Sequence, residues 1–149
     1  MFGKRMTWIV AAVLLASLAL SACSQATARP AASAEEPSKL EPIEGTELSR
    51  VILTEKAAER LGIETDQVRE VEIAGERRMV VPYAAVLYTE DGETWIYTNP
   101  EPPVFVRQSI TVERIEGDQA ILTDGPPVGT PVVTAGAAEL FGIEFGVGH

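Results

Sequence analysis

The chain has 149 residues, of which 46% are hydrophobic, and its formal net charge is −10, from 12 lysines and arginines against 22 aspartates and glutamates. This length accommodates one modest domain once a targeting segment is set aside. The acidic charge repels nucleic-acid phosphates and offers no polybasic patch to anionic lipid heads, so no nucleic-acid partner is expected. Because Cys23 is the one cysteine, an internal disulfide and a multi-cysteine zinc site are excluded.

The first 23 residues have three parts: a positive start with Lys4 and Arg5, an apolar run over residues 8–20, and the sequence Leu20-Ser21-Ala22-Cys23. The apolar run is shorter than the ~20 residues that cross a bilayer core. This pattern resembles a bacterial lipoprotein signal peptide, here residues 1–22. An uncleaved signal anchor, in which the cysteine is incidental, is the alternative.

The resemblance to lipoproteins implies that cleavage leaves Cys23 as the first residue, carrying a diacylglycerol thioether. With at least two acyl chains, such a lipid anchors a protein stably in a membrane. We therefore expect a lipid-anchored protein on the extracytoplasmic face of the cell membrane, which is the periplasmic side in a Gram-negative bacterium. Loss of Lys4 and Arg5 with the signal peptide makes the mature chain two units more acidic, about −12.

Residues 24–47 are rich in Ala, Pro, Ser and Glu and contain few bulky apolar side chains. Such a composition cannot bury enough apolar surface to offset the entropy of ordering. We expect residues 23–47, the lipidated cysteine included, to form a flexible linker.

A β-rich domain is expected over residues 48–142, followed by a tail over residues 143–149. Thr54 as N-cap and Gly62 after the last turn predict a helix over residues 55–61. Residues 90–93, Glu-Asp-Gly-Glu, predict a hairpin turn, and a bulge near Gln108 would bring the alternation of residues 104–113 into phase. Strands are expected at residues 50–53, 71–73, 78–81, 85–88, 94–98, 104–113, 120–123 and 131–134, and a helical turn at 136–140. The fold class is therefore all-β: a small antiparallel barrel or sandwich with one or two short helices.

The residue inventory argues against catalysis. His149 is the only histidine and the domain has no thiol, so a Ser-His-Asp or Cys-His enzyme is not expected. The carboxylates of the domain lie mostly at turns and on polar strand positions, where surface charge is the common role. Met79 is the only methionine past the signal peptide, which leaves a methionine-based metal site without ligands. We expect no enzyme activity, no metal and no cofactor apart from the covalent lipid.

Four aromatic residues are a candidate partner or ligand surface: Tyr83, Tyr88, Trp95 and Tyr97. Tyrosine and tryptophan combine a large apolar body with a polar tip, which suits binding faces. Packing in the core and rim of a small barrel is the alternative role for the same residues.

A series of segments resembles the C-terminal portion of periplasmic adaptor subunits, also called membrane fusion proteins, of RND-type and related efflux pumps. The series begins at Val81-Pro82-Tyr83-Ala84-Ala85-Val86 and continues through residues 91–97, 105–107, 117–122, Gly125, 129–134 and 136–140. Upstream, residues 51–55 and 61–63 are similar to the segment that enters the adaptor β-barrel. The resemblance implies β-barrel and membrane-proximal domains that contact a pump and perform no chemistry.

The chain departs from the adaptor pattern because no lipoyl-like domain and no long helical hairpin fits between Ile63 and Val81. An adaptor-like accessory lipoprotein is therefore expected, with an RND or ABC-type permease as partner in efflux or other transmembrane transport. A free-standing ligand-binding or envelope-structural lipoprotein is the alternative. A hydrolase is a third reading, which would require converging polar groups with shifted pKa values in a cleft.

Overall fold

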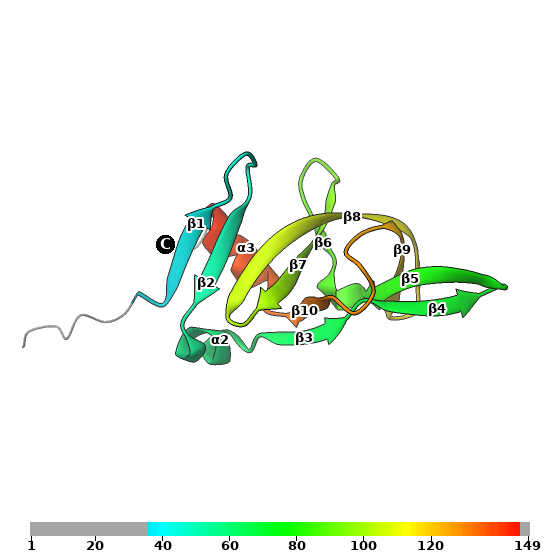
Figure 1. Cartoon of the computed structure of the whole chain (residues 1–149), viewed down its shortest axis with the longest axis horizontal. Helices are drawn as coiled ribbons and strands as arrows, with labels where there is room; N and C mark the ends of the chain where they lie inside the picture. The colour runs from blue at the N-terminus through cyan, green and yellow to red at the C-terminus, as the bar shows by residue number, and fades with distance from the viewer. Residues whose placement is uncertain (1–35, 147–149) are drawn as a thin grey trace, which may run out of the picture. The chain divides into compact units, whose positions relative to one another are not determined.

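The computed structural model describes residues 36–146 as a predominantly antiparallel β structure with two short α-helices, in the form of a half-barrel (Figure 1). The expected all-β fold class is confirmed. The strands are β1 (Ser38–Pro42), β2 (Ser49–Leu53), β3 (Glu64–Gln67), β4 (Arg69–Ile73), β5 (Glu76–Pro82), β6 (Leu87–Tyr88), β7 (Thr94–Glu101), β8 (Val104–Glu116), β9 (Gln119–Asp124) and β10 (Pro131–Ala135). The helices are α2 (Glu55–Leu61) and α3 (Ala137–Phe145), with a 3-10 turn, η1, at Tyr83–Ala85.

Strand β8 is the longest and joins two parts of the sheet. Its first half pairs with β7 and β2, and its second half pairs with β9. The strand order is β3-β10-β7-β8-β9-β5-β4, with β1 on β2 and β6 on β7. All pairs are antiparallel, as short hairpin connections allow.

Helix α2 begins and ends where the sequence predicts. The Thr54 side chain accepts a hydrogen bond from the backbone N–H of Ala57, which satisfies one of the free N–H groups of the first turn. Gly62 adopts a left-handed conformation and its N–H donates to the carbonyl of Glu59, which ends the helix.

Two apolar clusters are formed from the strands. The buried residues of the first cluster are Val68, Val81, Ala85, Val86, Ile96, Ile110, Ala120, Leu122 and Val132. The second lies beneath the two helices: Val51, Leu53, Ala57, Tyr97, Phe105, Val133, Ala137 and Leu140. Neighbouring residues of one strand, such as Ile96 and Tyr97, belong to different clusters because successive side chains of a strand point to opposite faces. The strands that share both clusters therefore have two buried faces.

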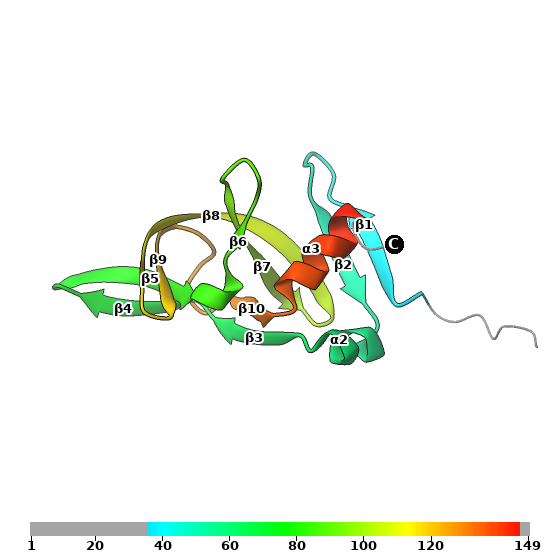
Figure 2. The ribbon, with the colours of Figure 1, turned by 180° about the vertical axis from the view of Figure 1, so that it is seen from behind.

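Helix α3 crosses the face of β2 and β7, as the view from behind shows (Figure 2). Ala137 and Leu140 are its buried residues. The preceding Gly136 has φ +83°, and a Cβ there would lie 2.3 Å from Ile63 Cδ1. Only glycine combines this backbone angle with so close an approach of Ile63, so Gly136 sets the start of α3.

Two expected boundaries are wrong. Ser38–Pro42 form β1 and pair with Ser49–Leu53, so the end of the predicted linker, residues 23–47, belongs to the folded unit. The predicted tail, residues 143–149, begins inside α3, which extends to Phe145. Composition misled the prediction at β1, because an edge strand supported by one neighbour needs few apolar residues. The signal peptide, Cys23 and His149 lie outside the described residues.

The predicted bulge is also displaced. Pairing between β7 and β8 runs without interruption from Thr94↔Ile110 to Thr98↔Val106, past Gln108. The register shifts of β8 fall near its two ends: one where β7 passes from Thr98 to Glu101, and others after Thr111, where β8 pairs with β9. No bulge is needed at Gln108 because β8 buries both of its faces there, with Arg107 on one side and Ile110 on the other.

Candidate functional site

The four aromatic residues predicted as one surface lie on two faces of the hairpin. Leu87 pairs with Trp95 and Tyr88 pairs with Thr94, so Tyr88 and Trp95 point to opposite sides. Tyr97, two residues after Trp95, shares the side of Trp95 and is fully buried. The predicted single aromatic surface is therefore divided.

Tyr83 and Tyr88 form an exposed pair, with 44% and 54% of their surfaces accessible. Partial desolvation raises the pKa of the Tyr88 phenol above its ordinary value, and the neighbouring Tyr83 hydroxyl adds to the increase. The Tyr88 phenol therefore stays protonated at physiological pH, and both rings are exposed to solvent.

Trp95 and Tyr97 lie instead beneath α3, where they meet Arg107 of β8 and Glu144 of α3. The Tyr97 hydroxyl donates a hydrogen bond to Glu144 Oε2, and Arg107 Nε lies 3.4 Å from the same oxygen. Only 8% of the Arg107 side chain and 4% of the Glu144 side chain are accessible. This is a buried ion pair with a tyrosine donor.

The Arg107 guanidinium is also held by aromatic rings. Its central carbon lies 4.0 Å from the centre of the Trp95 ring, 4.9 Å from that of Phe145 and 6.0 Å from that of Phe141. A cation over an aromatic face is attracted by the ring quadrupole, more strongly where water is excluded. We call these six residues the Arg107 site: Trp95, Tyr97, Arg107, Phe141, Glu144 and Phe145.

Local structure explains how the Arg107 site assembles. Tyr97 and Arg107 are directly paired across β7 and β8, which places both side chains on the same face. On α3, Phe141 lies three residues before Glu144 and four before Phe145, so all three project to one side of the helix. The rings of Phe141 and Phe145 lie 4.5 Å apart.

Electrostatics keep Tyr97 protonated. Burial raises its pKa well above the ordinary value, the hydrogen bond and negative charge of Glu144 raise it further, and Arg107 opposes the shift. A protonated phenol and a permanently charged guanidinium are hydrogen-bond donors rather than bases or nucleophiles. The Arg107 site is therefore suited to holding a carboxylate.

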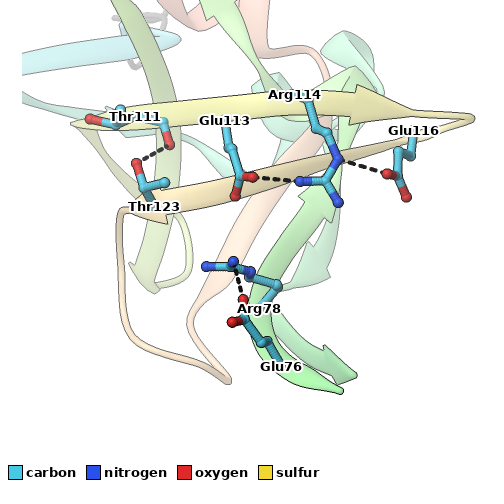
Figure 3. A network of polar contacts seen from close by, with 7 residues as sticks. All are labelled: Glu76, Arg78, Thr111, Glu113, Arg114, Glu116 and Thr123. Carbon is cyan, nitrogen blue, oxygen red and sulfur yellow. Dashed lines mark hydrogen bonds and ion pairs between the residues drawn. The ribbon is translucent and has the colours of Figure 1, made fainter. Parts of the chain in front are cut away.

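Two of the carboxylates expected at the surface, Glu113 and Glu116, lie there, and so does Glu76. Glu113 and Glu116 flank Arg114, and Glu76 contacts Arg78, on strands β8 and β5 (Figure 3). Among residues 36–146, no group of three or more His, Cys, Asp or Glu side chains is arranged to hold a metal ion. In the same part of the chain, no helix has the length and apolarity to cross a membrane.

Sequence reasoning missed both charged members of the Arg107 site. Arg107 lies two residues after the buried Phe105, so the alternation along the strand places its side chain on the same buried face. A charged residue at such a position indicates a buried polar contact. Glu144 had no such signal because it fell in the predicted tail. No family model matches this chain, and comparisons with curated proteins and with solved structures found no match either.

Proposed function

We propose that this protein is a noncatalytic, lipid-anchored accessory subunit of an extracytoplasmic transport system, similar in role to the pump-contacting part of a periplasmic adaptor. One observation carries the proposal: the adaptor-like segments occupy neighbouring strands of a single half-barrel. Residues 91–97 include the first half of β7, residues 105–107 lie in β8, and residues 117–122 form the turn after β8 and most of β9. These segments resemble parts of one adaptor module, and here they lie on adjacent strands. This arrangement supports the proposal that they act together as one unit.

The edges of the half-barrel support a role in contacts with other proteins. Within residues 36–146, β1, β3 and β4 each pair with one strand only. A strand with one neighbour presents free N–H and C=O groups along its other side, which a partner can cover. The sequence Leu20-Ser21-Ala22-Cys23 supplies the expected attachment to the membrane.

The proposal is tested by crosslinking intact cells of the native host, followed by mild solubilisation, capture of the tagged protein and mass spectrometry. Three forms are compared: wild type, Cys23→Ala, which removes the lipidated thiol, and Ser21→Ala, which keeps the cysteine and a small residue before it. A single permease recovered with wild type and Ser21→Ala, and reduced with Cys23→Ala, is the expected result.

Recovery of no permease, under conditions in which known pump complexes survive, would refute the transport role. The exposed Tyr83 and Tyr88 rings would then favour the second candidate, a free-standing ligand-binding lipoprotein. A lipid mass on the peptide that begins at Cys23, in wild type and Ser21→Ala only, checks the anchor independently of any partner.

A further inference from the structure

The Arg107 site already contains one bound carboxylate, supplied by the chain itself. Glu144 accepts the Tyr97 hydroxyl hydrogen bond and lies 3.4 Å from Arg107 Nε. The donors come from the sheet and the carboxylate comes from the C-terminal helix, so the two halves of this contact belong to different elements. The sheet half is complete without α3: a guanidinium, a phenol and the Trp95 ring.

The sheet half has donor capacity that Glu144 leaves unused. Among the described residues, Arg107 Nε is the one buried side-chain nitrogen or oxygen without a hydrogen-bond partner. Charge-assisted N–H···O bonds are typically about 2.7–2.9 Å long, and arginine often binds carboxylates through two parallel bonds. At 3.4 Å, Glu144 is farther from Nε than such a bond requires. A carboxylate not constrained by the helix can approach more closely.

Glu144 is also placed where it can be released. It is the second-last residue of α3, which ends at Phe145 before the left-handed Gly146. The fully buried anchor of the helix, Leu140, lies one turn earlier. Helix ends open more readily than helix centres, so opening the last turn would free Glu144 while Leu140 keeps the rest of α3 in place.

The aromatic rings around Arg107 indicate which group of a ligand would lie beside its carboxylate. Trp95 lies over the guanidinium at 4.0 Å and Phe145, half exposed at 50%, contacts it at 4.9 Å. When the last turn opens, Phe145 leaves with Glu144 and vacates an apolar position beside the cation. A ligand that fits both positions has a carboxylate next to an aromatic side chain, as Glu144 and Phe145 do.

We propose that Trp95, Tyr97 and Arg107 form a binding site for an acidic–aromatic peptide segment of a partner protein, which the chain occupies with its own Glu144 and Phe145 until that segment displaces them. The partner segment and the last turn of α3 compete for one site. This inference does not depend on the proposed transport role, because any partner with such a segment would use it.

Trp95 makes the proposal measurable by fluorescence, since the only other tryptophan, Trp8, lies in the expected signal peptide. The protein is the chain from Ser24 onward, as wild type, as Glu144→Gln and as the double variant Glu144→Ala/Phe145→Ala. The probe is an acetylated synthetic peptide with the sequence of residues 137–146. Its matched control has glutamine in place of the glutamate that corresponds to Glu144.

The expected result is a saturable change in Trp95 fluorescence when the glutamate peptide is added to either variant. The control peptide should bind at least about tenfold more weakly, because it lacks the charge that Arg107 attracts. Wild type should also bind the glutamate peptide at least about tenfold more weakly than the variants, because Glu144 occupies the site most of the time. Arg107→Met in the double variant should remove binding.

Equal affinity for the glutamate and glutamine peptides, in whichever of the three forms shows a cooperative urea transition, would overturn the proposal. So would the absence of any saturable change up to millimolar peptide. Either result would leave Glu144 as a structural clamp for α3 and nothing more. If both variants fail to fold, the same comparison is made in wild type, where each peptide must compete with Glu144 for the site.

Discussion

Two arginines of β8 show the same ion-pair chemistry in opposite surroundings. Arg107 meets Glu144 with 8% and 4% of the side chains accessible, whereas Arg114 meets Glu113 and Glu116 with 38%, 33% and 53% accessible. The surface contacts are the shorter ones, at 2.5 Å from Arg114 Nη1 to Glu113 and 2.7 Å from Arg114 Nε to Glu116, against 3.4 Å in the buried pair.

Distance alone does not rank these ion pairs by their contribution to stability. Water and salt screen the Arg114 contacts, and holding long exposed side chains in one geometry costs entropy. At Arg107, water cannot replace a missing partner, so removing one charge strands the other in a medium of low polarity. Burial therefore decides how much stability depends on each pair.

The largest expected effect is that of Glu144→Ala. The substitution leaves the Arg107 guanidinium and the Tyr97 hydroxyl buried without their carboxylate, so the free energy of unfolding should fall by about 3–5 kcal/mol. Urea unfolding of the chain from Ser24 onward, followed by Trp95 fluorescence, measures the change. A loss below about 1 kcal/mol would mean that water reaches Arg107 and that the pair behaves like a surface pair.

The double variant Arg107→Met/Glu144→Leu sharpens the interpretation of that loss. Replacing both charges with apolar side chains removes the stranded cation, and such replacements are often neutral or stabilising. The double variant should therefore be clearly more stable than Glu144→Ala alone. Equal loss in the two variants would assign the effect to packing of α3 rather than to charge.

Tyr97→Phe is expected to have the next largest effect. It removes the hydroxyl that donates to Glu144 Oε2 and keeps the ring that fills the second apolar cluster. A hydrogen bond to a charged group contributes about 1.5–3 kcal/mol, and the free energy of unfolding should fall by that amount. Tyr88→Phe is the matched control, because Tyr88 is 54% exposed and its loss of a hydroxyl should leave the urea midpoint unchanged.

Alkaline pH provides a third test of the buried region. The pKa of Tyr97 is raised in the folded state, chiefly by burial and then by Glu144, so the unfolded chain releases this proton first as pH rises past about 10. The contribution of Tyr97 to the free energy of unfolding is therefore fully present below about pH 10. Above pH 10 it declines by up to about 1.4 kcal/mol per pH unit.

The measurement is urea unfolding of wild type and Tyr97→Phe at several pH values from 9 to 11. Wild type should lose stability more steeply than Tyr97→Phe above pH 10, since the other ionisable groups are common to both. Parallel curves would show that Tyr97 titrates alike in the folded and unfolded chains.

Local signals predicted much of the fold. Thr54 and Gly62 mark both ends of α2 because their side chain and backbone act within one helical turn. The turn over residues 90–93 likewise predicted the β6–β7 hairpin, whose strands pair through Leu87 and Tyr88. The pairing of β1 with β2 was missed because its polar residues carry no periodic apolar pattern.

The Arg107 site was beyond such reasoning because its members meet only through tertiary packing. Arg107 and Glu144 are separated by β9, β10 and most of α3, and no spacing in the sequence joins them. The sequence identified Trp95 and Tyr97 as aromatic candidates. The alternation of side chains along a strand places both on one face of the hairpin, but it does not predict which face α3 covers. The lipidation of Cys23 remains a prediction from sequence.

Arg114→Ala is expected to have the smallest effect and completes the comparison. It removes contacts to both Glu113 and Glu116, shown in Figure 3, yet each of these carboxylates keeps its water when the arginine is lost. The urea midpoint should remain within experimental error of wild type, and any small difference at low salt should vanish at 1 M NaCl, where the screening length is about 3 Å. The effect of Glu144→Ala should persist at that salt concentration. A loss for Arg114→Ala as large as that for Glu144→Ala would show that the short surface contacts, rather than burial, decide the stability of β8.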